Sequence, residues 1–262
     1  MLLVIIQIAL AAVILGFLYI RMIRREIPKP IGTWQALVPV LFGIVSTLLS
    51  TLLTVAISIG LGLLGARVVE IGTPVVQSAV KALVGAGLTE ELIKLLMMLL
   101  SFRLFRPKNV YEYILIGAAV GIGFTLHEEY VYAGSAVGLV RMITLGMHTV
   151  LGIVMARYLG MARYQRRTGR SGAAKRIVLA FVLPLLIHTA YDTLTVANPA
   201  LQGLGTGMDE TSMLLYLVAG IAAVLVCAVW QVIVFVKLKK RAAEYSAMKT
   251  AAGDSAPTDP EP

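Results

Sequence analysis

The chain has 262 residues, of which 58% are apolar and only 14% charged. Soluble domains carry a charge on about a quarter of their residues, so this composition argues against a soluble protein. The apolar runs lack the strict alternation of a membrane β-barrel, which predicts an all-α, polytopic membrane helix bundle. The single cysteine, Cys227, excludes a disulfide framework and a cysteine metal site.

Seven apolar runs predict about seven transmembrane helices. Their expected bounds are 2–20, 34–64, 87–104, 114–134, 137–159, 176–197 and 213–236. Basic residues follow the first run instead of preceding it, which indicates a retained span and not a cleaved signal peptide. The second run is longer than one crossing needs, so we expect it to tilt, break or project.

Three further segments complete the organisation. The stretch 67–86 is typical of an amphipathic or interfacial segment. Residues 1–241 are expected to form one membrane-embedded unit, and the small, polar tail 242–262 is expected to be disordered. Two small-xxx-small pairs, Gly117 with Gly121 and Gly134 with Gly138, favour close helix contacts.

The basic residues lie in alternate loops. All but four of the 23 Lys and Arg fall in the segments 21–29, 103–108, 157–176 and 237–249. The positive-inside rule then predicts a multi-pass protein of the cell membrane with its N-terminus outside and its tail in the cytoplasm. The net charge of +9 follows from topology, so we expect contact with anionic lipid head groups at the cytoplasmic face and no nucleic-acid partner.

Several ionisable side chains fall inside the expected spans. They are His127, His148, His188, Glu90, Glu91, Lys94, Glu128, Glu129 and Asp192. A charge at mid-span costs on the order of 3 kcal/mol, so such residues are functional candidates. Four spans carry them at similar depth in the outer half, with His148 expected near the middle of the fifth span. We therefore expect them to converge.

Helical spacing supports this convergence. Glu90 and Lys94 share a helix face, as do His188 and Asp192. Phe124 and Glu128 also share a face, whereas His127 points about 100° away from Glu128. His127 is therefore expected to be a packing or interfacial residue.

Four motifs resemble, in order and across about 87–195, those of the PrsW family of intramembrane proteases, which is related to the CAAX prenyl endopeptidases. EELIK at 90–94 resembles the EExxK motif, and GFTLHE at 123–128 resembles GFxxxE. His148 is similar to the lone histidine of the third motif, and HTAYD at 188–192 resembles HxxxD. Glu129 departs from the pattern, because the family usually has Asn there. Lys94, Glu128 and Asp192 distinguish the chain from the CAAX pattern.

The resemblance implies an intramembrane endopeptidase. Its substrate would be a single-pass, membrane-anchored regulator, typically an anti-sigma factor, cut near the outer face. The residues expected to be catalytic are Glu90, Glu91, Glu128, His148, His188 and Asp192, with Lys94 and Phe124 supporting them.

The expected mechanism uses carboxylate-activated water with histidine assistance. One of Glu90 and Glu91 would act as the base and the other, in either order, as the acid, and His148 or His188 would donate to the oxyanion. Asp192 would orient His188. A metal-free reaction is favoured, and zinc is the alternative, since Glu128, His148, His188 and Asp192 are suitable ligands by type.

Other interpretations stay open. Buried acids and histidines also build proton- or ion-coupled transporters, although no clear inverted repeat is present. A non-catalytic membrane scaffold is a third class. Structurally, Thr89 could cap a helix whose first turn holds Glu90 and Glu91. Glu129 and Arg141 are expected at the outer interface or paired with each other.

Overall fold

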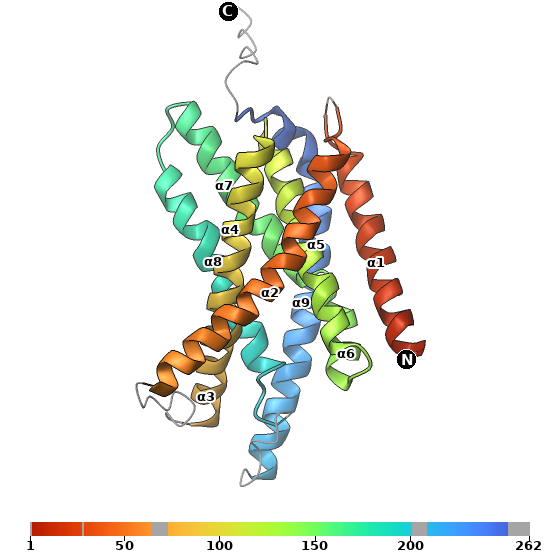
Figure 1. Cartoon of the computed structure of the whole chain (residues 1–262), viewed down its shortest axis with the longest axis vertical. Helices are drawn as coiled ribbons and strands as arrows, with labels where there is room; N and C mark the ends of the chain where they lie inside the picture. Colours follow the sequence, from red (N-terminus) through yellow and green to blue (C-terminus); the bar gives the residue numbers. More distant parts are fainter. Residues whose placement is uncertain (1, 28, 64–72, 201–208, 251–262) are drawn as a thin grey trace, which may run out of the picture.

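The protein is described here by a computed structural model, which covers residues 2–27, 29–63, 73–200 and 209–250. The described residues are helical almost throughout and contain no strand, only an isolated bridge between Asn109 and Lys249 (Figure 1). The prediction of an all-α bundle is confirmed.

The described residues form nine α-helices, seven of them long and two short. They are α1 Leu2–Ile23, α2 Thr33–Leu63, α3 Pro74–Lys81, α4 Leu88–Phe105, α5 Val110–Tyr132, α6 Ala136–Arg141, α7 Met147–Arg167, α8 Ala173–Leu194 and α9 Glu210–Ala247. A π-helical turn, η2 (Ala82–Gly87), joins α3 to α4, and a 3-10 turn, η3 (Met142–Thr144), follows α6.

Five helices, namely α1, α2, α5, α8 and α9, are long and apolar enough to cross a membrane. The segment 137–144 and α7 together make a sixth candidate, bent by 43° at their junction. The one expected span that is not among these candidates is 87–104, which corresponds to α4. This helix has 18 residues and carries Glu90, Glu91, Lys94 and Arg103, so its composition alone does not qualify it as a membrane span. The described residues therefore hold five to six candidate spans, and seven stays a prediction.

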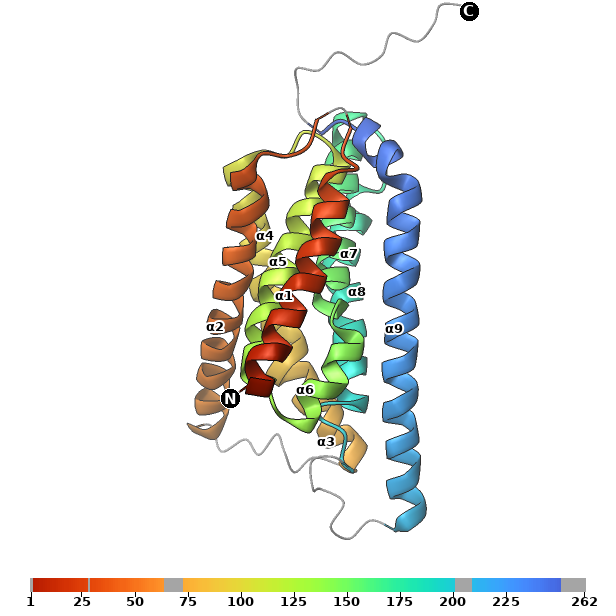
Figure 2. The ribbon, with the colours of Figure 1, turned by 90° about the vertical axis from the view of Figure 1, so that its right-hand side faces the viewer.

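Helix α5 forms the core of the bundle, with α2 on one side and α7 on the other (Figure 2). Glycines let these backbones approach. A Cβ added at Gly117 would lie 2.4 Å from the Gly152 carbonyl oxygen, and one at Gly121 would lie 2.3 Å from that of His148. The expected contact through Gly117 and Gly121 is confirmed, whereas Gly134 lies in a turn before α6 with φ of +77°.

Helix α2 is one continuous helix of 31 residues that includes Pro39. It crosses the bundle obliquely and without a break (Figure 1), in keeping with a tilt, one of the three outcomes expected for this run. Hydroxyl side chains on one of its faces, Ser46, Thr47 and Ser50, are buried against the interior.

In the stretch 67–86, expected to be amphipathic or interfacial, residues 74–86 form α3 and η2 and continue directly into α4. Residues 67–72 lie outside the described residues.

Two expectations about segments are corrected. The fifth run breaks at η3 instead of forming one straight span, because Gly146 and the turn before it interrupt the helix.

The tail is the second correction. Helix α9 runs on to Ala247 with Ala242 and Tyr245 buried. After it, Val110 N donates to the Met248 carbonyl at 3.1 Å and Thr250 N donates to that of Lys108 at 2.7 Å. Residues 242–250 are therefore ordered against the start of α5, and 251–262 lie outside the described residues.

Candidate active site

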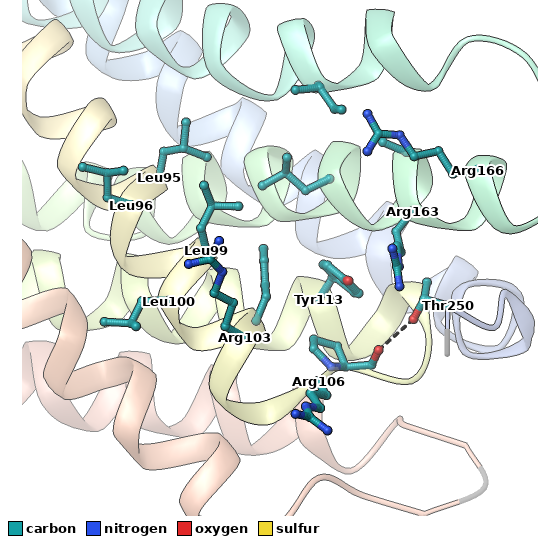
Figure 3. A pocket seen from close by; sticks show the side chains of 15 residues that line it. Leu95, Leu96, Leu99, Leu100, Arg103, Arg106, Tyr113, Arg163, Arg166 and Thr250 are labelled. Carbon is teal, nitrogen blue, oxygen red and sulfur yellow. Dashed lines mark hydrogen bonds between the residues drawn. The ribbon is translucent and has the colours of Figure 1, made fainter. Parts of the chain in front are cut away.

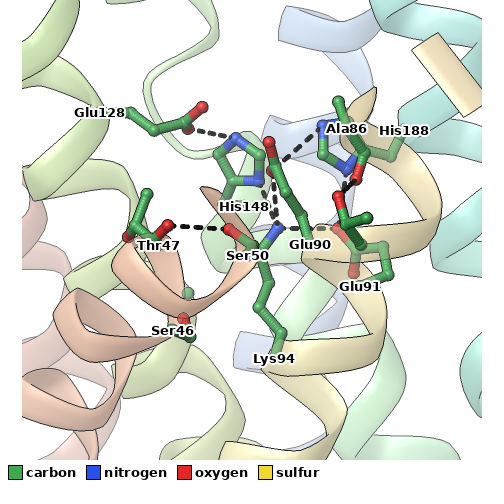
Figure 4. A network of polar contacts seen from close by, with 12 residues as sticks. Ser46, Thr47, Ser50, Ala86, Glu90, Glu91, Lys94, Glu128, His148 and His188 are labelled. Carbon is green, nitrogen blue, oxygen red and sulfur yellow. Dashed lines mark hydrogen bonds and ion pairs between the residues drawn. The ribbon is translucent and has the colours of Figure 1, made fainter. Parts of the chain in front are cut away.

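The expected site residues come together in the interior. Glu91 and Lys94 of α4, His148 of α7 and His188 of α8 meet in one polar network, with Glu128 of α5 at its edge (Figure 4). Glu91, Lys94, His148 and His188 are each at most 3% exposed. The convergence expected from helical spacing is thus present. Whether these residues catalyse a reaction stays a prediction.

Lys94 lies at the centre of the network and contacts three of its side chains. Its Nζ donates to Glu91 Oε1 at 2.7 Å and contacts His148 Nδ1 at 2.8 Å. Because an ammonium group only donates, His148 Nδ1 accepts this bond and Nε2 carries the ring proton. That proton points to Glu128 Oε2, 2.5 Å from Nε2. The ammonium also lies 3.8 Å from the centre of the Phe124 ring, a cation–π contact that accounts for the phenylalanine.

His188 also directs its Nδ1 toward a side chain of α4. Its Nδ1 lies 2.8 Å from Glu91 Oε1, and its Nε2 lies 3.3 Å from Asp192 Oδ2 and 3.7 Å from Glu90 Oε2. Glu91 therefore fixes the ring so that Nε2 faces Glu90 and Asp192. The two histidine rings pack edge to face, with centroids 4.9 Å apart.

Arg141 is the residue whose role sequence reasoning underestimated. It forms the expected pair with Glu129, at 3.5 Å between Nε and Oε1. It is also only 8% exposed and donates from Nη2 to Glu128 Oε2 at 2.5 Å. Arg141 is thus a buried counterion of the site and not an interfacial residue. The signal available in the sequence was an arginine inside an apolar run, opposite two adjacent acids.

One local expectation is wrong. Thr89 does not cap a helix, because helical backbone runs through η2 into α4 and the Thr89 hydroxyl instead donates to the Gly85 carbonyl at 3.1 Å. His148 lies in the first turn of α7, just after the bend of the candidate span that 137–144 and α7 form together. The break at η3 is what brings His148 level with Glu90 and His188.

Two further groups flank the site. His127 does not join the network and lies beside Tyr130, with ring centroids 6.4 Å apart, in keeping with a packing role. The hydroxyl face of α2, which sequence reasoning missed, does lie beside it (Figure 4). Thr54 extends this face and meets Thr89 at 2.9 Å between hydroxyl oxygens. Small hydroxyl residues at helical spacing within an apolar run were the available signal.

A metal ion fits the donor set. One ligand atom from each of Glu90, His148 and His188 lies within 4.8 Å of the other two. Glu90 Oε2 is buried and has no hydrogen-bond partner in the structure, so it is available as a ligand. A histidine that binds a metal through one ring nitrogen is usually oriented by a hydrogen bond at the other nitrogen. Glu91 makes this contact at Nδ1 of His188, which leaves Nε2 for the ion. To bind the ion, His148 would give up its contact with Lys94 at Nδ1 or with Glu128 at Nε2.

Long apolar helices around a buried cluster of acids and histidines define a multi-pass membrane protein with an ionisable centre. Within that class, the chain belongs to the PrsW family of intramembrane metalloproteases, whose family model matches residues 32–228. The match covers every residue of the network and leaves α1 outside it.

Curated relatives agree with this assignment. Protease PrsW of Bacillus subtilis (strain 168) is 30% identical over 117 residues, which is 43% of this chain and 52% of that protein. Protease PrsW of Halalkalibacterium halodurans is 28% identical over 119 residues, 44% of this chain and 54% of that protein. The chain thus matches about half the length of these relatives. The comparison with solved structures gave no significant match.

Proposed function

We propose that this protein is an intramembrane endopeptidase whose reaction takes place at the Glu90, Glu91, His148 and His188 cluster. The observation that carries the proposal is the meeting of acids and histidines from four helices in one buried network, in a chain of the PrsW family. Burying ionisable groups in a membrane bundle costs free energy, so a cluster of them indicates a functional site and not packing alone.

We further propose that the site works with a divalent metal, zinc by preference, held by Glu90, His148 and His188. When bound, such an ion polarises a carbonyl oxygen and lowers the pKa of water. The motifs alone favoured a metal-free reaction. The Glu90 oxygen without a hydrogen-bond partner and the family's description as metalloproteases shift our preference to the metal.

The remaining residues would position groups and move protons. Oε1 of Glu91 is engaged by Lys94 and His188, while its buried Oε2 has no hydrogen-bond partner. This fixed carboxylate with one open oxygen is suited to accept a proton from water and return it to the leaving amine. Glu91 would orient His188 through Nδ1, and Asp192 would lie beside the Nε2 nitrogen that faces the ion. Glu128 would hold His148 in a single tautomer.

The proposed substrate is a single-pass, membrane-anchored regulatory protein of the anti-sigma-factor kind. The site lies in the half of the bundle away from the basic loops, so the scissile bond would be near the outer face. The amides of a substrate helix are already hydrogen-bonded, and local opening before attack is easiest near water. The basic loops at the other end would meet anionic lipid head groups.

Purified protein with a single-pass substrate in lipid nanodiscs tests the activity. We expect Glu91→Gln and His188→Gln to abolish cleavage while the protein still inserts and purifies, because Lys94 keeps Glu90 as a counterion at 3.7 Å when Glu91 is replaced. Glu210→Gln, an exposed acid at the start of α9, and His127→Gln are the matched controls and retain it. Cleavage by Glu91→Gln at the native rate would reject the proposed base. Ion flux in proteoliposomes without any cleavage would favour a transporter.

Metal content tests the second proposal independently of activity. We expect elemental analysis to find about one zinc per chain in the wild type, and a large loss in Glu90→Gln and in His188→Gln, because each removes one of three ligands. His127→Gln keeps its metal. Full activity of metal-free protein after dialysis against a chelator would contradict metal dependence and return the mechanism to carboxylates alone.

A further inference from the structure

A large groove lies between α4, α7 and α8, away from the candidate active site and toward the end of the bundle where α4 and α7 finish (Figure 3). Its volume is about 1060 Å³. It begins at Leu95, the residue that follows Lys94, so the site and the groove occupy successive parts of α4. The Thr250 hydroxyl donates to the Pro107 carbonyl at 2.8 Å at its rim.

One end of the groove is strongly basic. Arg103 and Arg106 come from the end of α4, and Arg163 and Arg166 come from the facing end of α7. All four are exposed, and none forms an ion pair or hydrogen bond with another side chain in the described residues. Four arginines on two facing walls therefore leave an uncompensated positive site.

The backbone at Arg106 supports a role for this end. Arg106 ends α4 in the left-handed conformation, with φ of 48° and ψ of 65°, while its N–H donates to the Phe102 carbonyl. Among the described residues it is the only one other than glycine with positive φ. Glycine is the residue this position favours on conformational grounds. An arginine here is consistent with a use for its charge.

The rest of the groove is apolar. Leu96, Leu99 and Leu100 of α4 line it and are between 41% and 47% exposed. Ile177 of α8 faces them from the other wall. From Leu95 to Arg103 the helix rises ~12 Å. One leaflet of the hydrocarbon core is ~15 Å deep, so the apolar part spans most of a leaflet.

We propose that this groove binds an anionic phospholipid, with its phosphate on the arginines and an acyl chain along the α4 leucines. The charge of the rim and the length of the apolar wall together match a lipid of one leaflet. A substrate helix is a poorer occupant, because the cytoplasmic flank of a single-pass protein is usually rich in Lys and Arg. The four arginines would repel such a flank.

A lipid in this groove would act on the site through its helices. α4 carries Glu91, α7 carries His148 and α8 carries His188. The lipid would fill the gap between these three helices just beyond the network. Binding is therefore expected to raise thermal stability, since a ligand that binds only the folded protein stabilises it.

Native mass spectrometry of purified full-length protein, titrated with phosphatidylglycerol or phosphatidylcholine, tests the proposal. We expect phosphatidylglycerol to bind and to raise the melting temperature, whereas phosphatidylcholine and inorganic phosphate alone do neither. Replacing two arginines from opposite walls, Arg103→Gln with Arg163→Gln, is expected to weaken binding about 30-fold, the loss that follows from two basic side chains near an anionic group.

Two further variants separate a groove from general surface charge. Lys239→Gln with Lys240→Gln removes the same charge from the exposed end of α9 and is expected to bind as the wild type does. Leu99→Trp fills the groove without changing its charge and is expected to lose binding. Equal weakening by the α9 pair, equal binding of phosphatidylcholine, stabilisation by phosphate alone or unchanged binding in Leu99→Trp would each overturn the proposal.

Discussion

At the scale of single residues, the geometry of the site depends on a buried charge balance. Glu128 and Glu129 are adjacent, and both pair with Arg141. Lys94 likewise forms a buried ion pair with Glu91. Removing one member of a buried pair is far more costly than the pair is stabilising, because the partner is left as an isolated charge. Each of these cations is therefore sensitive to substitution.

Arg141→Gln is expected to lower the melting temperature and to reduce activity, because it leaves two neighbouring carboxylates without their cation. The cost of breaking a buried pair is about 3–5 kcal/mol. Adding Glu129→Gln to Arg141→Gln removes one of the two acids and is expected to restore part of the stability. Thermal unfolding in detergent measures both, and an unchanged melting temperature in Arg141→Gln would refute the counterion role.

Glu26, in the loop after α1, gives a pH dependence of stability. Burial raises the pKa of its carboxyl from the ordinary 4.5 to about 7, and the nearby charge of Glu112 adds to this, against the hydrogen bonds from Ile31 N and Asn109. The folded state therefore binds the proton more tightly. This contribution to stability is complete below about pH 4.5 and is lost as the pH rises through about 7.

Melting temperatures between about pH 5 and about pH 8 test this dependence. We expect the wild type to lose stability over that interval and Glu26→Gln, which mimics the protonated side chain, to lose much less. Glu244→Gln, an exposed acid near the same end of the bundle, serves as the control and should follow the wild type. Parallel curves for wild type and Glu26→Gln would rule out the assignment.

At the scale of helices, close backbone contact of α5 with its neighbours sets the width of the bundle. Gly43 of α2 shows how little room there is, because an added Cβ would lie 2.1 Å from the Val120 carbonyl oxygen. Gly60 of the same helix has no atom within 4 Å of such a Cβ. The two positions form a matched pair for testing the contact.

Gly43→Ala is expected to destabilise the protein and to reduce activity, because the clash is with backbone and α2 must move. Gly60→Ala is expected to be neutral or stabilising, since alanine is favoured over glycine in a helix by about 1 kcal/mol. Thermal unfolding and substrate cleavage of the two variants measure the difference. Similar behaviour of both would mean that helix propensity and not backbone contact determines the effect.

Helix α1 lies outside the family match but is hydrogen-bonded to the segment 133–146, which contains α6 and carries Arg141. Gln7 donates to Glu129 Oε2 at 3.0 Å and to the Gly138 carbonyl at 3.1 Å, and accepts from Gly134 N at 3.2 Å. Gln7→Leu is expected to speed amide exchange in the segment 133–146 and to lower activity. Val13→Ala, on the exposed side of α1, is the control. Unchanged amide exchange in Gln7→Leu would show that α1 does not restrain this segment.

At the scale of the whole molecule, the ends of the bundle differ in charge. The turn after α7 lies at the end to which the basic loops belong, and the start of α9 lies at the other end (Figure 1). Thr168→Cys and Glu210→Cys place labels at these two exposed positions on a Cys227→Ser background. Glu210→Cys is expected to react with an impermeant maleimide in intact cells. Thr168→Cys is expected to react only after permeabilisation, and its labelling in intact cells would reverse the orientation.

The sequence by itself determined the helical membrane class, the approximate bounds of the long helices, and the meeting of Glu91, Lys94, His148 and His188. These features follow from local chemistry, because apolar length selects helices and a period of 3.6 residues selects the face. The motifs also indicated the family that the family model then matched.

Only the tertiary structure decided the features that depend on contacts between distant segments. The burial of Arg141 between Glu128 and Glu129, the ordering of residues 242–250 against α5 and the continuation of η2 into α4 belong to this group. The position of His148 at the start of α7 does too. Periodicity along one helix carries no information about which other helix supplies a partner, so these features appear only when the bundle is assembled.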